Sequence, residues 1–219
     1  MADVLKSLDD ICAMNKRYRT NFVNALSGVK SANLIGTTGL HGDNLAIINS
    51  VFHLGADPAL MGMIMRPHTV QRDTLSNIKE NGCYTINHVC RDIVEQAHQT
   101  SARYPETVSE FDAVGLTPYF SDSFTSPYVK ECRLKIGLMV EDIVFISANQ
   151  TEMVIGSIQE VIVDSACLQE DGHLDLNAID SIGVAGLDHY QGLQSLARYQ
   201  YAKPDVKLEQ HRGGSVKPD

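Results

Sequence analysis

The sequence predicts a mainly β protein with inserted helices, built on a closed or partly closed antiparallel barrel. Six or seven apolar segments of strand length occur along the chain, and short links rich in Gly, Asp and Pro join most of them. Helical segments are inserted at intervals and do not alternate with the strands one for one. Hairpin links of this kind favour an antiparallel barrel over a parallel doubly wound sheet.

Composition limits the class of protein. The chain has 219 residues and a net charge of -9, which argues against a general nucleic-acid binder because such a surface should be basic. No apolar stretch is long enough to span a bilayer, and the first residues lack the features of a secretory signal. The five cysteines are scattered and form no CxxC pair. We therefore expect a cytoplasmic protein with free thiols and no membrane association.

Three regions are predicted along the chain. Residues 1–28 have a helix-compatible pattern that ends at Gly28, and we expect an N-terminal helical extension. Residues 29–201 contain the apolar segments and form the barrel domain. Residues 202–219 are polar and form a C-terminal tail.

The first half of the barrel domain has the clearest local signals. Strands are predicted at residues 31–38, 44–54, 60–65 and 83–89. The near-continuous apolar run from Asn44 to Leu54 predicts a strand covered on both faces. Gly62, inside its strand, indicates a bulge or a close backbone approach. A helix is predicted to start with Asp73 as its N-cap and to stop at Gly82.

The second half is less regular. Helical composition from Arg91 to Tyr104 is followed by a long excursion over residues 105–130, with a short helix near Ser109–Ala113. Further strands are predicted at residues 131–140, 143–148 and 153–164. Residues 175–182 form a helix or a short strand.

Several motifs of enzyme chemistry do not occur in the sequence. There is no GxGxxG after a strand, and no GxxxxGK[ST], HExxH or GxSxG. The His and Cys residues show no metal-ligand spacing beyond His88-Val89-Cys90, which is weak. We therefore expect no Rossmann domain, no metal site and no catalytic acid–base pair.

The segment from Arg66 to Thr74 is the strongest positive signal. Arg66 and Arg72 can make bidentate contacts to a phosphate, and Thr69 and Thr74 offer hydroxyl groups. Thr74 falls in the first turn of the predicted helix, where free N–H groups favour an anion. The alternative is that both arginines lie on a solvated loop or pair with nearby carboxylates.

Other polar residues have two interpretations each. Asn49 and Ser50 interrupt an apolar strand, so they could bond the polar edge of a heterocycle or mark a strand end that faces water. His88 and His98 are candidates for proton transfer or phosphate contact, although a lone His is more often structural. Met61, Met63 and Met65 alternate on one strand face, for which packing is the expected role.

From Asn44 to Asn87 the order of segments resembles the flavin reductase-like family. The matching features are an apolar strand, an Asp-Pro turn, a second apolar strand, a basic loop, and then RDTLSNIKENG and CYTINHV. SEFDAVGLTP, SPYVKECRLKIGLMV, MVIGSIQEVIVD and LDLNAIDSIGVAGLDHYQ are similar to later segments of the family. The resemblance covers about residues 29–201.

The resemblance implies an FMN-binding split barrel that forms a homodimer. It implies that Asn49, Ser50, Val51 and Phe52 line the isoalloxazine ring, and that Arg66, Thr69, Arg72 and Thr74 hold the phosphate. His98 and Ser101 match the polar stretch that completes the site. Many relatives have Ser and an aromatic residue where this chain has Asn49 and Ser50.

The resemblance further implies an oxidoreductase of the flavin reductase type. A hydride passes from NAD(P)H to FMN, and the electrons pass to a small-molecule or protein acceptor. The alternative is a non-enzymatic FMN electron carrier, similar to flavoredoxin, without its own nicotinamide site. A third interpretation is a barrel that uses the same phosphate loop for another small ligand.

Overall fold

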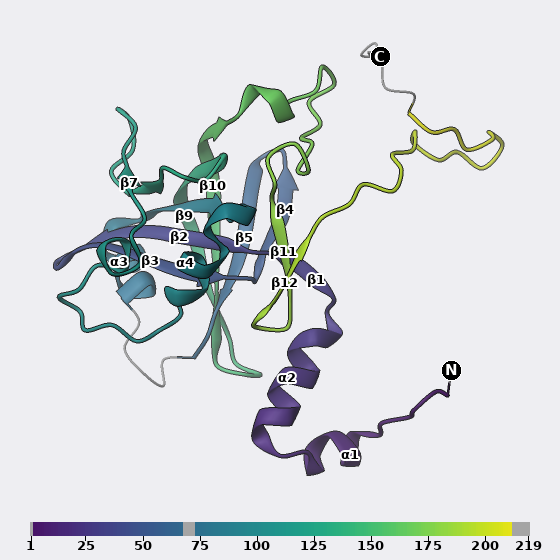
Figure 1. The fold of residues 1–219 in the computed structure, drawn as a ribbon, viewed down its shortest axis with the longest axis horizontal. Coiled ribbons are helices and arrows are strands. Elements are labelled where there is room, and N and C mark those ends of the chain that lie inside the picture. The colour runs from purple at the N-terminus through teal and green to yellow at the C-terminus, as the bar shows by residue number, and fades with distance from the viewer. Residues whose placement is uncertain (1, 68–72, 212–219) are drawn as a thin grey trace.

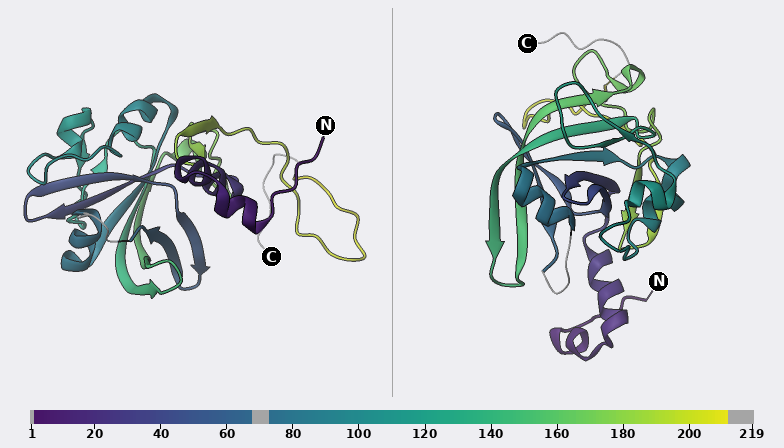
Figure 2. Two further views of the ribbon diagram at one scale, coloured as in Figure 1. Left: turned by 90° about the horizontal axis from the view of Figure 1, so that it is seen from below. Right: turned by 90° about the vertical axis from the view of Figure 1, so that its left-hand side faces the viewer.

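A seven-stranded antiparallel sheet curves into an open barrel (Figures 1 and 2). The computed structural model describes residues 2–67 and 73–211. Within them the sheet order is β3-β2-β6-β9-β10-β5-β4, so β3 and β4 are its two ends. The strands are β2 (Asn33–Gly39), β3 (Gly42–Ile48), β4 (Val51–Ala56), β5 (Ala59–Met65), β6 (Cys83–His88), β9 (Leu134–Ile146) and β10 (Thr151–Val163). The predicted fold class, an antiparallel barrel that is only partly closed, is confirmed.

The break in the barrel lies between β3 and β4. One strand over Asn44–Leu54 was the expectation, and it is wrong because β3 ends at Ile48 and β4 starts at Val51. The Ser50 hydroxyl donates to the Ile64 carbonyl oxygen at 2.7 Å and accepts from the Ile64 N–H at 3.3 Å, replacing a main-chain pair at this point. The prediction that this segment is covered on both faces is also wrong, because Leu45 is the only buried residue of the edge strand β3.

A bulge joins two predicted strands into one. Two separate strands were predicted at residues 131–140 and 143–148, but β9 runs through the polar pair Glu141-Asp142 between them. Ile155 pairs with Asp142 while its neighbour Gly156 pairs with Val140, which leaves Glu141 as the extra residue. A bulge bends a strand and increases its twist, so it lets this long hairpin follow the curved barrel.

The main helices pack against β2 and β3. Helix α3 (Asp73–Asn81) ends before Gly82, whose φ of +69° confirms the predicted stop. The helix predicted over 91–104 is shorter, with a 3-10 turn η1 (Arg91–Ile93) and helix α4 (Val94–Gln99). The predicted short helix in the excursion is confirmed as α5 (Glu110–Val114).

Smaller elements complete the fold. They are a three-stranded sheet of β1 (Val29–Ser31), β11 (Ile182–Ala185) and β12 (His189–Gly192), a two-stranded sheet of β7 (Pro118–Tyr119) and β8 (Tyr128–Val129), and the 3-10 turn η2 (Ser165–Cys167). The helix or strand expected over residues 175–182 is absent, because these residues form turns and a bridge up to Ser181 and strand β11 begins only at Ile182.

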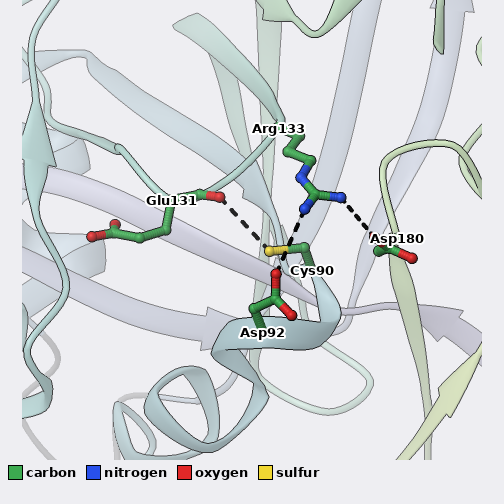
Figure 3. Close-up of polar contacts among 5 residues, drawn as sticks. All are labelled: Cys90, Asp92, Glu131, Arg133 and Asp180. Atoms are coloured by element: carbon green, nitrogen blue, oxygen red, sulfur yellow. Dashed lines mark hydrogen bonds and ion pairs between the residues drawn. The ribbon is translucent and has the colours of Figure 1, made fainter. Parts of the chain in front are cut away.

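Polar contacts attach the segment before β11 to the barrel (Figure 3). Arg133, just before β9, pairs with Asp180 at 2.7 Å and with Asp92 at 3.6 Å. The Cys90 thiol donates to the Glu131 carbonyl oxygen at 3.7 Å. Ion pairs this exposed contribute at most about 1 kcal/mol each, so their effect is to set position more than stability.

The barrel interior is filled by one side of each strand. Ile35, Tyr84, Ile86 and Leu138 are among its buried side chains, and Leu75 and Ile78 of α3 belong to the same cluster. The packing role predicted for the methionines is confirmed, since Met63 and Met65 are buried and Met61 packs against the cluster. A Cβ on Gly62 would overlap the Phe52 ring, so the close approach at this glycine comes from a side chain and not from the backbone that was expected.

Both ends of the described chain extend away from the barrel (Figures 1 and 2). Helices α1 (Leu8–Ala13) and α2 (Lys16–Leu26) begin with side-chain caps from Ser7 and Asn15, and neither helix has a buried residue. The segment after β12 is also largely exposed. Among the described residues, no helix is long and apolar enough to cross a membrane.

Candidate functional site

A cavity of about 1020 Å³ lies where the barrel is open. Its wall is formed by the end of β3, the Asn49-Ser50 link, the end of β5 and the start of α3. Residues 98–107 and a stretch from Val184 to Tyr190 close the other side. Of the ten residues predicted for the site, the wall contains Asn49, Ser50, Arg66, Thr74, His98 and Ser101.

Side chains from α4 and α5 cover the free edge of β3 and thereby build one wall of the cavity. The Thr100 hydroxyl accepts the Ile47 N–H at 3.0 Å, and the Ser109 hydroxyl donates to the Asp43 carbonyl oxygen at 2.6 Å. Glu110 Oε2 accepts the Leu45 N–H at 3.0 Å. Alternate residues of an edge strand direct their main-chain groups outward, and these contacts pair them.

Asn49 and Ser50 are both committed to structural bonds. Asn49 Nδ2 donates to the Gly186 carbonyl oxygen at 2.7 Å, which ties the cavity's floor to the loop after β11. Ser50 bonds both main-chain groups of Ile64. The remaining capacity of this link for a ligand therefore lies in its main-chain groups, in Asn49 Oδ1, in the second N–H of Asn49 Nδ2 and in one lone pair of Ser50 Oγ.

A chain of hydrogen bonds runs from α5 to the first turn of α3. Asn44 Nδ2 donates to Glu110 Oε2 at 2.8 Å, and Asn44 Oδ1 accepts the Thr74 hydroxyl at 2.8 Å. Asn44 Oδ1 also accepts the Thr37 hydroxyl at 3.3 Å. Burial raises the pKa of Glu110 above its ordinary value, against the opposing effect of the bonds from Leu45 and Asn44.

Arg66 is exposed and lines the cavity, as do Asp73 and Thr74 at the start of α3. The first N–H groups of a helix have no partner within the helix. A guanidinium beside such a helix start is suited to an anion. Thr69 and Arg72, the other two residues predicted for the phosphate, lie outside the described residues.

His98 and Tyr190 form a pair at the opposite wall. His98 Nδ1 lies 2.9 Å from the Tyr190 hydroxyl, and the rings meet edge to face with centroids 5.6 Å apart. Burial, and then the charge of Asp188, raise the pKa of Tyr190, so this phenol stays protonated at neutral pH. Ser101, one turn after His98, lines the same wall.

Two predicted residues lie away from the cavity. Val51 packs against the barrel core, and Phe52 lies over Gly62 on the neighbouring strand. The other candidate histidine, His88, is half-buried and contacts Ser181 Oγ at 3.3 Å, outside the cavity wall. Among residues 2–67 and 73–211, no group of three or more His, Cys, Asp or Glu side chains could hold a metal ion.

The sequence analysis missed Asn44, Thr100, Glu110 and Tyr190. Each lines the cavity, but each reaches it through contacts with residues 53 to 92 positions away in the chain. The nearest signal in the sequence was the long excursion after Tyr104, because a long excursion in a compact domain usually has a function.

Comparisons with known proteins agree with this arrangement. The family model described as "Flavin reductase like domain" matches residues 26–177. A Shewanella frigidimarina NCIMB 400 structure, described as a candidate flavin reductase with a split barrel domain, is 50% identical and has a TM-score of 0.88. That match covers 91% of this chain and 100% of the other.

Two more distant structures share the fold. Flavoredoxin of Desulfovibrio vulgaris (Miyazaki F) is 26% identical with a TM-score of 0.67, and the match covers 81% of this chain and 92% of flavoredoxin. Nitrilotriacetate monooxygenase component B from Bacillus cereus is 18% identical with a TM-score of 0.79, and the match covers 89% of this chain and 98% of the other. With its split barrel, its cavity at the opening and a family match over most of its length, this chain belongs to the flavin reductase-like family.

Proposed function

We propose that this protein is an FMN-dependent oxidoreductase of the flavin reductase type. In this proposal a hydride comes from NADH or NADPH, and the electrons go on to a small-molecule or protein acceptor. The observation that carries it is the cavity at the barrel opening, whose lining combines apolar side chains with Arg66, Arg103 and several hydroxyl groups in a member of this family.

The residues of the cavity fit the parts of FMN. Ile47 and Ile48 line one wall, and Val184 and Leu187 line another, so apolar surface is available for a planar ring. Arg66 supplies positive charge for a phosphate, and the start of α3, which lines the same cavity, supplies N–H groups. Cofactor sites commonly combine such apolar walls with a few placed polar groups.

The chain's own task is then binding and orientation. FMN, when bound, accepts a hydride and donates electrons, so the protein need not supply an acid–base pair. The edge contacts from Thr100, Ser109 and Glu110 hold the wall of residues 98–110 against β3. Asn49 holds the loop at Gly186 against the opening.

The first test is an absorption spectrum of the protein purified without added flavin and then mixed with FMN. It is repeated anaerobically after addition of NADH or NADPH. Flavin bands that bleach with either nicotinamide support the proposal. Absence of flavin bands even after mixing with FMN would refute it and would leave a barrel for a different small ligand.

A second candidate is an FMN electron carrier without a nicotinamide site. The similarity to flavoredoxin of Desulfovibrio vulgaris (Miyazaki F) favours it, because that structure is 26% identical over 81% of this chain. The same spectra separate the two candidates. An electron carrier would keep its flavin bands with both nicotinamides and lose them only with a chemical reductant.

Arg66 can be tested as the phosphate ligand by comparing FMN with riboflavin, which lacks the phosphate. Loss of a charge-assisted contact costs about 1.5–3 kcal/mol, so Arg66→Met should weaken FMN roughly 10- to 100-fold. Riboflavin affinity should stay unchanged. Arg103→Met is the matched control, because Arg103 also lines the cavity and carries the same charge. Equal effects of the two variants would remove the assignment to Arg66.

We also propose that the protein is a homodimer in a reducing compartment such as the cytoplasm. Leu5, Leu8 and Leu26 in the N-terminal extension are 90%, 74% and 64% exposed, which suits contact with a second subunit. All five cysteines are free, and four of them are buried. Light scattering should give twice the chain mass of 24.1 kDa. A monomer at micromolar concentration would contradict the dimer.

A further inference from the structure

With Glu110 ionised, the hydrogen bonds around Asn44 have one consistent direction. Glu110 Oε2 accepts the main-chain N–H of Leu45 at 3.0 Å, so this oxygen presents lone pairs to its neighbours. The Asn44 side chain lies 2.8 Å from the same oxygen and must place its NH₂ group there. Its carbonyl oxygen then faces the opposite way, towards α3.

This orientation determines where the Thr74 proton points. Thr74 Oγ lies 2.8 Å from Asn44 Oδ1, which can only accept, so Thr74 donates its single hydroxyl proton to Asn44. Thr37 donates to the same oxygen and accepts from Asn77 Nδ2 at 3.1 Å, so it reinforces the direction. Thr74 is 5% exposed and lines the cavity, where its oxygen is left with lone pairs alone.

A hydroxyl that presents only lone pairs is a poor partner for a phosphate and a good partner for an alcohol. Phosphate oxygens are acceptors and need a donor, whereas a sugar-alcohol chain has O–H groups to donate. Turning the Thr74 proton towards the cavity would remove a donor from Asn44 Oδ1. Among the described residues, Arg66, Arg103 and the main-chain N–H groups at the start of α3 also line the cavity and can serve an anion instead.

We propose that Thr74 accepts a hydrogen bond from a hydroxyl of the ligand's sugar-alcohol chain, and that Glu110 is the positioning residue that gives Thr74 this role through Asn44. This inference rests on the proposed function, because the ribityl chain of a flavin supplies such hydroxyls. It differs from the role in phosphate binding that the family resemblance implies for Thr74.

The test compares three flavins by fluorescence titration of the flavin-free protein. FMN has both the ribityl chain and the phosphate, riboflavin has the chain alone, and lumiflavin has neither. Thr74→Val removes the hydroxyl at nearly constant shape. We expect it to weaken FMN and riboflavin by the same factor, about 3- to 10-fold for one hydrogen bond, and to leave lumiflavin unchanged. Thr74→Ser keeps the hydroxyl and should bind all three like the wild type.

Three results would overturn the inference. Weakening of FMN alone would assign the hydroxyl to the phosphate. Equal weakening of all three flavins would indicate a structural effect on the cavity, and no change with any flavin would mean that Thr74 makes no contact. In each case the wild-type protein still binds flavin and the proposed function stands. Failure of the wild type to bind any of the three would overturn the proposed function as well.

Glu110 has its own pair of variants. Glu110→Gln keeps an acceptor oxygen for Leu45 and Asn44, so the relative affinities for the three flavins should follow the wild type. Glu110→Ala removes the acceptor and should weaken FMN and riboflavin as Thr74→Val does. If Glu110 acts through Thr74, the double variant Glu110→Ala/Thr74→Val should be no weaker than Thr74→Val alone. Additive losses would assign Glu110 a separate role.

Discussion

The contact that joins α4 to the edge of the barrel can be removed with one isosteric substitution, Thr100→Val. Thr100 is 4% exposed, and its hydroxyl accepts the Ile47 N–H at 3.0 Å and donates to the Ala97 carbonyl oxygen at 2.8 Å. Valine has nearly the same shape but can neither accept nor donate. The variant therefore leaves a main-chain donor and a main-chain acceptor at the cavity wall without their side-chain partner.

The expected loss of stability follows from these two bonds. A buried N–H left unpaired costs about 1–3 kcal/mol, whereas a carbonyl oxygen that loses one of its donors costs less. We expect a decrease of about 2 kcal/mol in the free energy of unfolding. With a urea dependence of roughly 2–3 kcal/mol per M, the unfolding midpoint should fall by about 1 M or slightly less.

Amide hydrogen exchange gives the local measurement. The Ile47 amide should exchange much faster in Thr100→Val, because it has lost its acceptor at the sheet edge. Thr100→Ser is the control, since it loses a methyl group but keeps the hydroxyl, and the Ile47 amide should stay protected. Equal protection of this amide in the two variants would refute the assignment of Thr100 as its acceptor.

Two further predictions concern groups outside the cavity. Burial lowers the pKa of His88 to about 4 from 6.5 in the unfolded chain, so the folded protein keeps this residue neutral. The stability that depends on this neutral imidazole is complete above pH 6.5 and is lost as the pH falls towards 4. The loss in the free energy of unfolding amounts to about 3 kcal/mol. In urea titrations between pH 4 and 6.5, His88→Gln should make the free energy of unfolding less dependent on pH. An unchanged pH dependence would contradict the assignment of this effect to His88. A Cβ on Gly36 would overlap the Pro127 carbonyl oxygen, which also accepts the Thr85 hydroxyl at 2.6 Å. Gly36→Ala should therefore lower the free energy of unfolding by about 3 kcal/mol. Thr85→Val, which removes only the hydrogen bond, should lower it by about 1 kcal/mol. A Gly36→Ala variant as stable as the wild type would show that the Pro127 segment can move freely.

Local signals in the sequence were sufficient where one segment determines its own conformation. Helix α3 was predictable because a glycine, Gly82, follows its last residue and apolar residues recur at helical spacing. The hairpin link before β3 and the alternating methionines of β5 were predictable for similar reasons. The six or seven predicted strands with hairpin links were enough to identify the fold class, because strands joined in this way pair antiparallel.

Errors arose where a polar pair interrupts an apolar run. Such a pair means a strand end at Asn49-Ser50 but only a bulge at Glu141-Asp142. What separates the two cases is the partner strand. Ser50 bonds Ile64 in place of a ladder pair, whereas β10 continues its pairing past Glu141. Neither partner is visible in the local sequence.

The sequence by itself therefore determined the succession of strands along the chain, the basic segment at Arg66 and the helix start that follows it. These features depend on neighbours within a few positions. Tertiary structure alone decided that Asn44, Thr100 and Glu110 belong to the cavity and that the Thr74 hydroxyl points away from it. The physical reason is that a hydroxyl or an amide has no fixed role until its partners determine which atom donates. Those partners come from α5 and β3, 65 and 66 positions apart in the chain.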